Sequence, residues 1–140
     1  PFSIIAQSMG YLREKASGSV TAVYGSQARR ILPCAQSGSY NLYLNMQNWL
    51  LVANPTNETV EATILFSGPN SAAEKLVTLA PHAQAYIPVH GNSELNRAPD
   101  TYGLISVYPK DPTIRLFSEV LRLRYRANGT PDFSMPVPVR

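Results

Sequence analysis

The stretch that decides the fold is NWLLVANPTNETVEATILFS, residues 48–67. Its second half, from residue 58, alternates with a period of two. Mostly polar residues separate four hydrophobic ones on one face, namely Val60, Ala62, Ile64 and Phe66. Such alternation predicts a β-strand that turns one face to a core and the other towards water.

The first half of the stretch is an apolar run from Trp49 to Ala53. The run is too short for a core helix, and Asn54-Pro55-Thr56-Asn57 ends it with residues that favour a turn. We therefore expect a fully buried strand, followed by a hairpin into residues 58–67.

Further strands are expected on both sides of this hairpin, at short intervals joined by Pro, Gly and Asn turns. Residues 37–47 are interpreted as a loop that leads into the central strand, and residues 91–100 as a polar loop that holds at most one helical turn. The pattern predicts an all-β, antiparallel β-sandwich. The further strands are expected at residues 74–79, 83–89, 102–108, 114–125 and 132–139.

The core of this sandwich is expected to contain the central tryptophan, because that residue lies in the least polar run of the chain and large aromatic side chains dominate core energetics. The residues predicted to be buried together are Trp49, Leu51, Val60, Ile64, Phe66, Ile87 and Ile105.

Composition agrees with a folded domain. The chain has 140 residues, of which 44% are hydrophobic and 15% charged, so disorder is disfavoured. No run of about 18 apolar residues occurs, so no membrane-spanning helix is expected. The net charge of +3 is compatible with an anionic partner without requiring one, and we expect no nucleic-acid partner.

Residues that could carry chemistry are few and scattered. Cys34 is the single cysteine, best interpreted as a small apolar residue; a reactive thiol would need a base or cation nearby, such as Arg29 or Arg30. His82 and His90 both lie beside turns and share no ligand spacing with Cys34. Acidic clusters for calcium and glycine-rich phosphate loops are missing from the sequence. We therefore expect no enzyme, no metal and no cofactor, and name no catalytic residue.

Two glycosylation sequons lie in predicted turns, at Asn57-Glu58-Thr59 and Asn128-Gly129-Thr130. They matter only in a secreted protein made by a host that glycosylates asparagine. Both asparagines are expected to be exposed.

One charged pattern is a candidate binding surface. In RLRYRA, residues 122–127, a strand would place Arg122, Arg124 and Arg126 on one face. Such a row can bind carboxylates, sulfates or phosphates, and the eight tyrosines could stack on sugars. The alternative is a solvated strand face, or an edge protected by charge against wrong pairing.

The two ends of the chain resemble each other. When residues 1–19 are laid on residues 112–130 without a gap, Pro1 falls on Pro112. Further on, Ser17 falls on Asn128 and Ser19 on Thr130, which are like-for-like exchanges. The other identities are Leu12-Arg13 with Leu123-Arg124, Ala16 with Ala127 and Gly18 with Gly129.

The series NWLLVANPTNETVEATILF…LVTLAPHAQAYIPVH…YGLISVYPKDPTIRLFSEVLRLRY, within residues 40–126, resembles the immunoglobulin-like sandwich repeats of large bacterial cell-surface proteins. Those repeats have a Trp-Leu strand ending in Asn-Pro, a Thr/Val-rich strand, a Leu-x-Pro turn and a final strand that opens with Pro. The resemblance implies an immunoglobulin-like domain over residues 40–140, an extracellular or cell-surface location, and a structural or adhesive role without cofactor or catalytic residues.

Residues 1–39 depart from that repeat as an extra N-terminal strand segment. Residues 1–13 resemble the final strand of a preceding repeat. The chain begins with Pro1, as expected of a processed chain or of a fragment of a tandem array. The strand could therefore belong to a neighbouring repeat, enter the sheet of another copy, or pair inside its own sandwich. We name as the candidate inter-subunit strand Phe2, Ile4, Ile5, Met9, Tyr11 and Leu12.

These observations give two hypotheses of function. The first is a structural subunit or repeat of an extracellular fibre or appendage, whose partners are other copies of itself or neighbouring repeats, joined by strand addition. The alternative is a β-sandwich module that binds a surface polysaccharide or another polyanion through the arginine row.

Overall fold

The protein is an all-β sandwich of two antiparallel four-stranded sheets, as the sequence predicts. The computed structural model describes residues 7–13, 16–27, 36–69, 71–95 and 97–139. In those ranges there is no α-helix, and two short 3-10 turns occur, η1 (Tyr43–Asn45) and η2 (Ser93–Leu95). The strands are β1 (Gln7–Arg13), β2 (Val20–Gln27), β3 (Gln36–Asn41), β4 (Gln47–Ala53), β5 (Val60–Ser67), β6 (Ala72–Leu79), β7 (Gln84–Pro88), β8 (Tyr102–Pro109), β9 (Phe117–Tyr125) and β10 (Pro131–Pro138).

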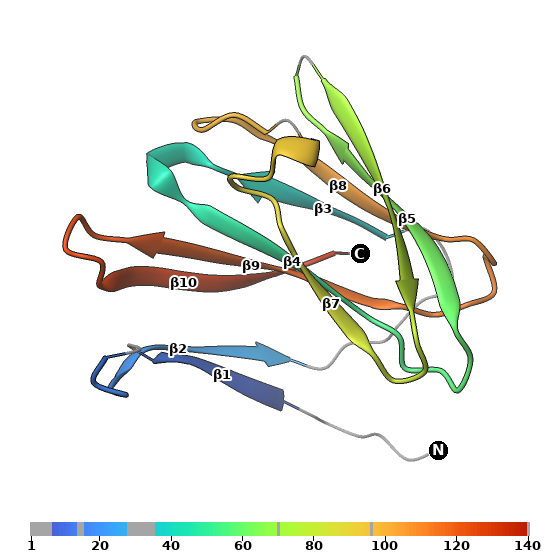
Figure 1. The fold of residues 1–140 in the computed structure, drawn as a ribbon, viewed down its shortest axis with the longest axis horizontal. Helices are drawn as coiled ribbons and strands as arrows, with labels where there is room; N and C mark the ends of the chain where they lie inside the picture. The colour runs from blue at the N-terminus through green and yellow to red at the C-terminus, as the bar shows by residue number, and fades with distance from the viewer. Residues whose placement is uncertain (1–6, 14–15, 28–35, 70, 96, 140) are drawn as a thin grey trace.

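The two sheets have the strand orders β10-β9-β4-β7 and β3-β8-β5-β6. All neighbouring strands are antiparallel, so each sheet can turn one face to a common core. Figure 1 shows the two layers facing each other across the middle of the molecule. No helix in the described part of the chain is long and apolar enough to cross a membrane.

The core lies between the two sheets and is built by alternation along the strands. β5 follows the predicted period of two, with Val60, Ala62, Ile64 and Phe66 all buried. Ile87 and Ile105 are buried as well, so these core predictions are confirmed. The further fully or nearly buried residues include Tyr40, Leu42, Leu50, Val52, Leu79, Val89, Leu95, Val107, Leu116 and Val120.

The prediction for β4 is wrong in phase. Trp49 and Leu51 are only partly buried, while Leu50 and Val52 have 0% exposure. β4 is therefore not buried on both faces. Trp49 lies on the outer face of its sheet, where its ring meets His90 edge-on at a centroid distance of 5.1 Å. An unbroken apolar run hides which face points inward, since both alternating sets are hydrophobic.

The interpretation of residues 37–47 as a loop is also wrong at its start. Residues 36–41 form β3, an edge strand that pairs with β8. The boundary expected between residues 39 and 40 thus lies inside β3. Its sequence, QSGSYN, contains only one large hydrophobic residue, Tyr40, so alternation could not reveal the strand.

A buried asparagine, Asn48, lies near the start of β4. Asn48 has 0% exposure and bridges to the backbone of Asn41: Asn48 Nδ2 donates to Asn41 O at 2.7 Å, and Asn48 Oδ1 accepts from Asn41 N at 2.9 Å. This paired contact ties β3 to β4 across the η1 turn. A side-chain amide can bridge in this way because it offers a donor and an acceptor side by side.

Gly103 of β8 lies where no side chain fits. A Cβ at this position would overlap Ser67 O and lie 2.7 Å from Tyr40 Oη. Tyr40 cannot retreat easily, because it is 1% exposed and its hydroxyl accepts a hydrogen bond from Arg97 Nη1 at 3.1 Å.

Gly103→Ala is therefore expected to lower the free energy of unfolding by about 1–3 kcal/mol through overpacking. Chemical denaturation followed by far-UV circular dichroism measures this loss. Gly91→Ala is the matched control, because a Cβ there meets nothing within 4 Å and only its φ of +60° adds strain. Equal losses in the two variants would contradict the account.

β1 and β2 form a separate two-stranded hairpin outside both sheets. Figure 1 shows this hairpin as a further layer beside β9 and β10, on the side away from β3 and β8. β2 is the strand of the pair that lies close to β10.

Candidate interaction surfaces

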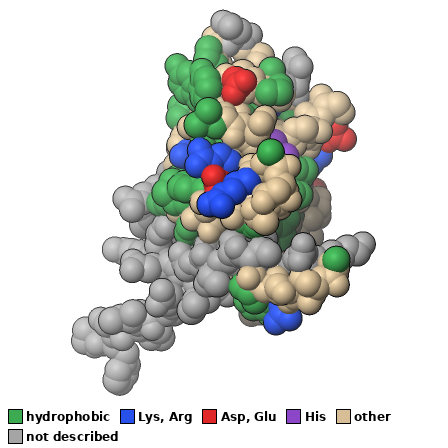
Figure 2. Space-filling model, turned by 90° about the vertical axis from the view of Figure 1, so that its left-hand side faces the viewer, with side chains coloured by type: hydrophobic (Ala, Val, Ile, Leu, Met, Phe, Trp, Pro, Cys, Tyr) green, Lys and Arg blue, Asp and Glu red, His purple; other side chains and the backbone are tan. Residues whose placement is uncertain are grey.

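The arginine row predicted at residues 122–126 is only partly a row. Arg122 and Arg124 lie two positions apart on the same face of β9. Arg126 lies in the exposed turn that follows. Arg124 Nε pairs with Asp132 Oδ1 at 3.0 Å across the β9–β10 hairpin. Figure 2 looks onto this end of the sandwich and shows basic side chains on either side of an acidic one. One cation of the row is therefore already neutralised within the chain.

Arg122 has a different environment. It reaches the opposite sheet, where its Nη2 donates to Ser39 O at 3.0 Å and to Ser39 Oγ at 2.8 Å. Its Nε is buried and has no hydrogen-bond partner among the described residues. Burial lowers the pKa of this guanidinium below its usual value, since desolvation disfavours the charged form.

A shallow groove lies beside Arg122. Tyr43, from η1, and Tyr102, at the start of β8, stack there with ring centroids 6.4 Å apart and planes inclined by 28°. Both rings are exposed. The complete lining is Ser39, Tyr40, Asn41, Tyr43, Tyr102, Gly103, Leu104 and Arg122. Two exposed rings beside a guanidinium can stack on a sugar and bind an acidic substituent.

The η1 turn that supplies Tyr43 has an unusual backbone. Leu44 and Asn45 both have positive φ, of 57° and 56°. Leu44 is held there by Asp100, whose Oδ1 accepts from the Leu44 N–H at 3.2 Å, and its side chain is 66% exposed. A non-glycine residue in the left-handed region costs free energy, which other contacts must offset. Neither this turn nor the groove is indicated by the sequence pattern.

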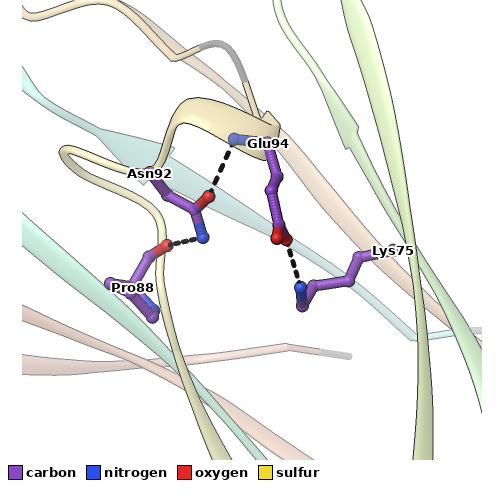
Figure 3. A network of polar contacts seen from close by, with 4 residues as sticks. All are labelled: Lys75, Pro88, Asn92 and Glu94. Atoms are coloured by element: carbon purple, nitrogen blue, oxygen red, sulfur yellow. Dashed lines mark hydrogen bonds and ion pairs between the residues drawn. The ribbon is translucent and has the colours of Figure 1, made fainter.

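A polar network joins β7 of one sheet to β6 of the other through η2. Lys75 of β6 pairs with Glu94 of η2 at 2.5 Å. Asn92 Oδ1 accepts from the Glu94 N–H at 3.0 Å, and Asn92 Nδ2 donates to Pro88 O at 3.2 Å. Figure 3 shows this chain of contacts running from β7 through η2 to β6. The Lys75 ammonium lowers the pKa of Glu94, first through the hydrogen bond and then through its charge.

The histidines and sequons lie in turns, as expected. The exposed His82 contacts Asn57, with Nε2 2.8 Å from Asn57 Oδ1, while His90 Nδ1 lies 2.9 Å from the carbonyl oxygen of Asn48. Asn57 and Asn128 are both exposed. In the described ranges no three His, Cys, Asp or Glu side chains lie together as metal ligands would, and Cys34 lies outside those ranges.

Only part of the candidate inter-subunit strand lies in β1. Met9, Tyr11 and Leu12 belong to β1, and Phe2, Ile4 and Ile5 lie outside the described residues. β1 pairs with β2, a neighbour in the sequence that the strand pattern does not indicate. The turn closes because Gly18 adopts a φ of +68° and Ser17 Oγ accepts from the Ser19 N–H at 3.1 Å.

The free edges of the described strands differ in their protection. β10 carries Pro131, Pro136 and Pro138, which lack N–H donors, and β7 is short and ends in Pro88. β1 has no proline and, among the described residues, pairs with β2 on one side only. Its other edge is a set of backbone groups that a further strand can bind.

Comparison with known proteins finds the fold and no family. No protein-family model matches the chain, and no curated protein sequence matches it. The crystal structure of Thermotoga maritima 1070 is similar, with a TM-score of 0.61 at 14% sequence identity. The similarity covers 76% of this chain and 92% of that chain. At this identity the likeness shows a shared β-sandwich fold alone.

Proposed function

We propose that the protein is a structural subunit or repeat of an extracellular or cell-surface fibre, array or appendage, which joins other copies or neighbouring repeats by strand addition. The observation that carries the proposal is the edge of β1 that no described strand pairs with, in a hairpin outside both sheets of the sandwich. The resemblance to immunoglobulin-like repeats of bacterial cell-surface proteins supports the location. The proposal needs no enzyme activity and no cofactor.

Strand addition suits β1 because backbone hydrogen bonds supply the attraction, and these do not depend on a special side chain. A hairpin of two strands is marginally stable by itself, so a third strand would stabilise it. Tyr11 and Val20, near the turn of the hairpin, are 57% and 52% exposed. Their apolar surface is available to a partner.

The test is the assembly of the full chain and of two proline variants, Gly10→Pro and Tyr11→Pro. Adjacent N–H groups of a strand point to opposite edges, so one substitution removes a hydrogen bond to β2 and the other blocks only the free edge. Chemical shifts of β2 identify which variant keeps the hairpin.

In sedimentation velocity and electron microscopy, the unmodified chain is expected to form a ladder of multimers or extended particles. The variant that keeps its hairpin should remain a monomer. The proposal fails if the unmodified chain stays monomeric at every concentration, or if that variant assembles normally.

A second candidate function is binding of an acidic polysaccharide in the groove beside Arg122, favoured by the stacked Tyr43 and Tyr102 rings. Tyr102→Ala should then shorten retention of the chain on an immobilised sulfated or uronic-acid glycan. Tyr86→Ala is the matched control, since Tyr86 is similarly exposed but lies outside the groove. Equal retention of the two variants rules this function out.

A further inference from the structure

The N-terminal hairpin has the same construction as the hairpin that ends the sandwich. Gly18 and Gly129 are 111 positions apart, and this offset places the whole of β2 on β10. The same offset places β1 within β9. The match of strand boundaries thus continues through the second strand, beyond the stretch in which the two sequences are alike.

The two turns agree in atomic detail. Gly18 and Gly129 both have positive φ, of 68° and 80°. Ser17 Oγ accepts a hydrogen bond from the Ser19 N–H at 3.1 Å, and Asn128 Oδ1 accepts one from the Thr130 N–H at 3.1 Å. An oxygen-bearing side chain thus stabilises each turn from the position before the glycine.

The strand pairing agrees in part. The second strand of each hairpin has one extra residue at equivalent positions, Thr21 and Asp132. Both irregularities lie at the turn end of the hairpin. Bulges are specific features of a sheet, so their shared position supports a common origin of the two hairpins.

The pairing of the strands differs by one residue, because Met9 lies opposite Gly25 whereas Val120 lies opposite Val137 and not Pro136. The hairpins differ further in the neighbour of the first strand. β9 pairs with β10 on one side and with β4 on the other. β1 pairs with β2 and has no second strand in the described part of the chain.

We infer that β1–β2 is a second copy of the terminal hairpin, and that the free edge of β1 binds a strand of another sandwich of this kind. That strand is the one that corresponds to β4, and it is called a β4-type strand below. The inference rests on the proposed function, since it names the strand that is added.

The offset also gives the register. Leu50 of β4 lies opposite Val120 of β9, and Met9 is at the position of Val120. A β4-type strand should therefore place its Leu50 equivalent opposite Met9. In an intact sandwich β4 already has β9 and β7 on its two sides. The partner must thus be a sandwich without a terminal hairpin of its own, such as the preceding unit of an array.

The test is a fusion that supplies this partner. A second copy of residues 28–111, which holds β3 to β8, is placed directly before Pro1 of the full chain. Pro1 then follows Asp111 as Pro112 does in the native sequence. If the hairpins are equivalent, the added strands fold with β1–β2 into a second sandwich. The calorimetric unfolding enthalpy per chain should rise by about half or more, because this enthalpy scales with the number of folded residues.

Two controls define the result. In the first, residues 28–111 follow Arg140 of a chain that begins at residue 28, so that β1–β2 is absent, and no rise over that shortened chain is expected. In the second, Met9→Glu in the test fusion should remove the rise, because Val120, at the equivalent position, has 0% exposure. An unchanged enthalpy in the test fusion overturns the inference. A rise in the first control overturns it too, since the added strands would then fold without the hairpin.

The fusion separates this inference from the proposed function. A second sandwich in the fusion, with no multimers of the unmodified chain, would keep the hairpin equivalence and reject self-assembly of the chain. Multimers of the unmodified chain, with no second sandwich in the fusion, would keep strand addition and reject the β4-type partner.

Discussion

Replacing Leu50 with alanine is expected to lower the free energy of unfolding by about 2–5 kcal/mol. Leu50 has 0% exposure and lies between Val120 of β9 and Ile87 of β7, whose side chains share its core face. Truncation removes buried surface and leaves a cavity that two paired strands cannot close. Guanidinium unfolding followed by far-UV circular dichroism measures the loss.

The neighbouring residue is the control. Trp49 is larger, but it lies partly exposed on the outer face of β4. Trp49→Ala should therefore cost less than Leu50→Ala, although tryptophan has more surface to lose. A larger loss for Trp49→Ala would show that β4 faces the core with its odd-numbered residues, and that the register described here is wrong.

Asn54→Asp is expected to be similarly severe at neutral pH, costing about 3–5 kcal/mol, the usual effect of an uncompensated buried charge. Asn54 is 1% exposed. Its Nδ2 lies 2.7 Å from Glu58 O, 3.0 Å from Ala80 O and 3.2 Å from Leu79 O. A carboxylate here would direct negative charge at three carbonyl oxygens.

The pH dependence of the Asn54→Asp effect has a definite sign. Burial and the carbonyl oxygens raise the pKa of the introduced carboxyl above its value in the unfolded chain. The destabilisation relative to the unmodified chain is therefore largest above the folded pKa and shrinks as the pH falls towards the unfolded pKa.

The control is Asn128→Asp. The Asn128 side chain is exposed and, in the described structure, only accepts hydrogen bonds, from the Thr130 N–H and Oγ1. Paired urea titrations of each variant and the unmodified chain at pH 7 and pH 4 give the differences. A loss for Asn54→Asp that is the same at both pH values would contradict the account.

Most of the fold could be predicted from the alternation of hydrophobic and polar residues along the strands. β5 could be predicted because its hydrophobic and polar residues separate by face, from Val60 to Phe66. β4 could be located but not oriented, since Trp49 and Leu50 are both hydrophobic. Asn48 lies on the core face of β4, although asparagine is usually found at the surface. A buried amide needs hydrogen-bond partners, and the sequence does not show that such partners are present.

The candidate surfaces were harder to predict, because they combine residues far apart in the sequence. Tyr43 and Tyr102 meet through a strained turn, and Arg122 turns to Ser39 of the opposite sheet instead of to solvent. Neither contact leaves a periodic signal. The repeat of the chain ends is visible in the sequence at Leu12-Arg13 and Gly18, but the turn hydrogen bonds and the bulges are visible only in the structure.

Residue-resolved amide hydrogen exchange of the full chain tests the central claim, that β1 presents a free edge on which another strand assembles. In dilute solution alternate amides of β1 should exchange far faster than those of β9, which has a partner on both sides. At concentrations where multimers form, the same β1 amides should slow by about tenfold or more. Unchanged exchange of β1 on assembly, or protection equal to that of β9 in the dilute monomer, would contradict the account.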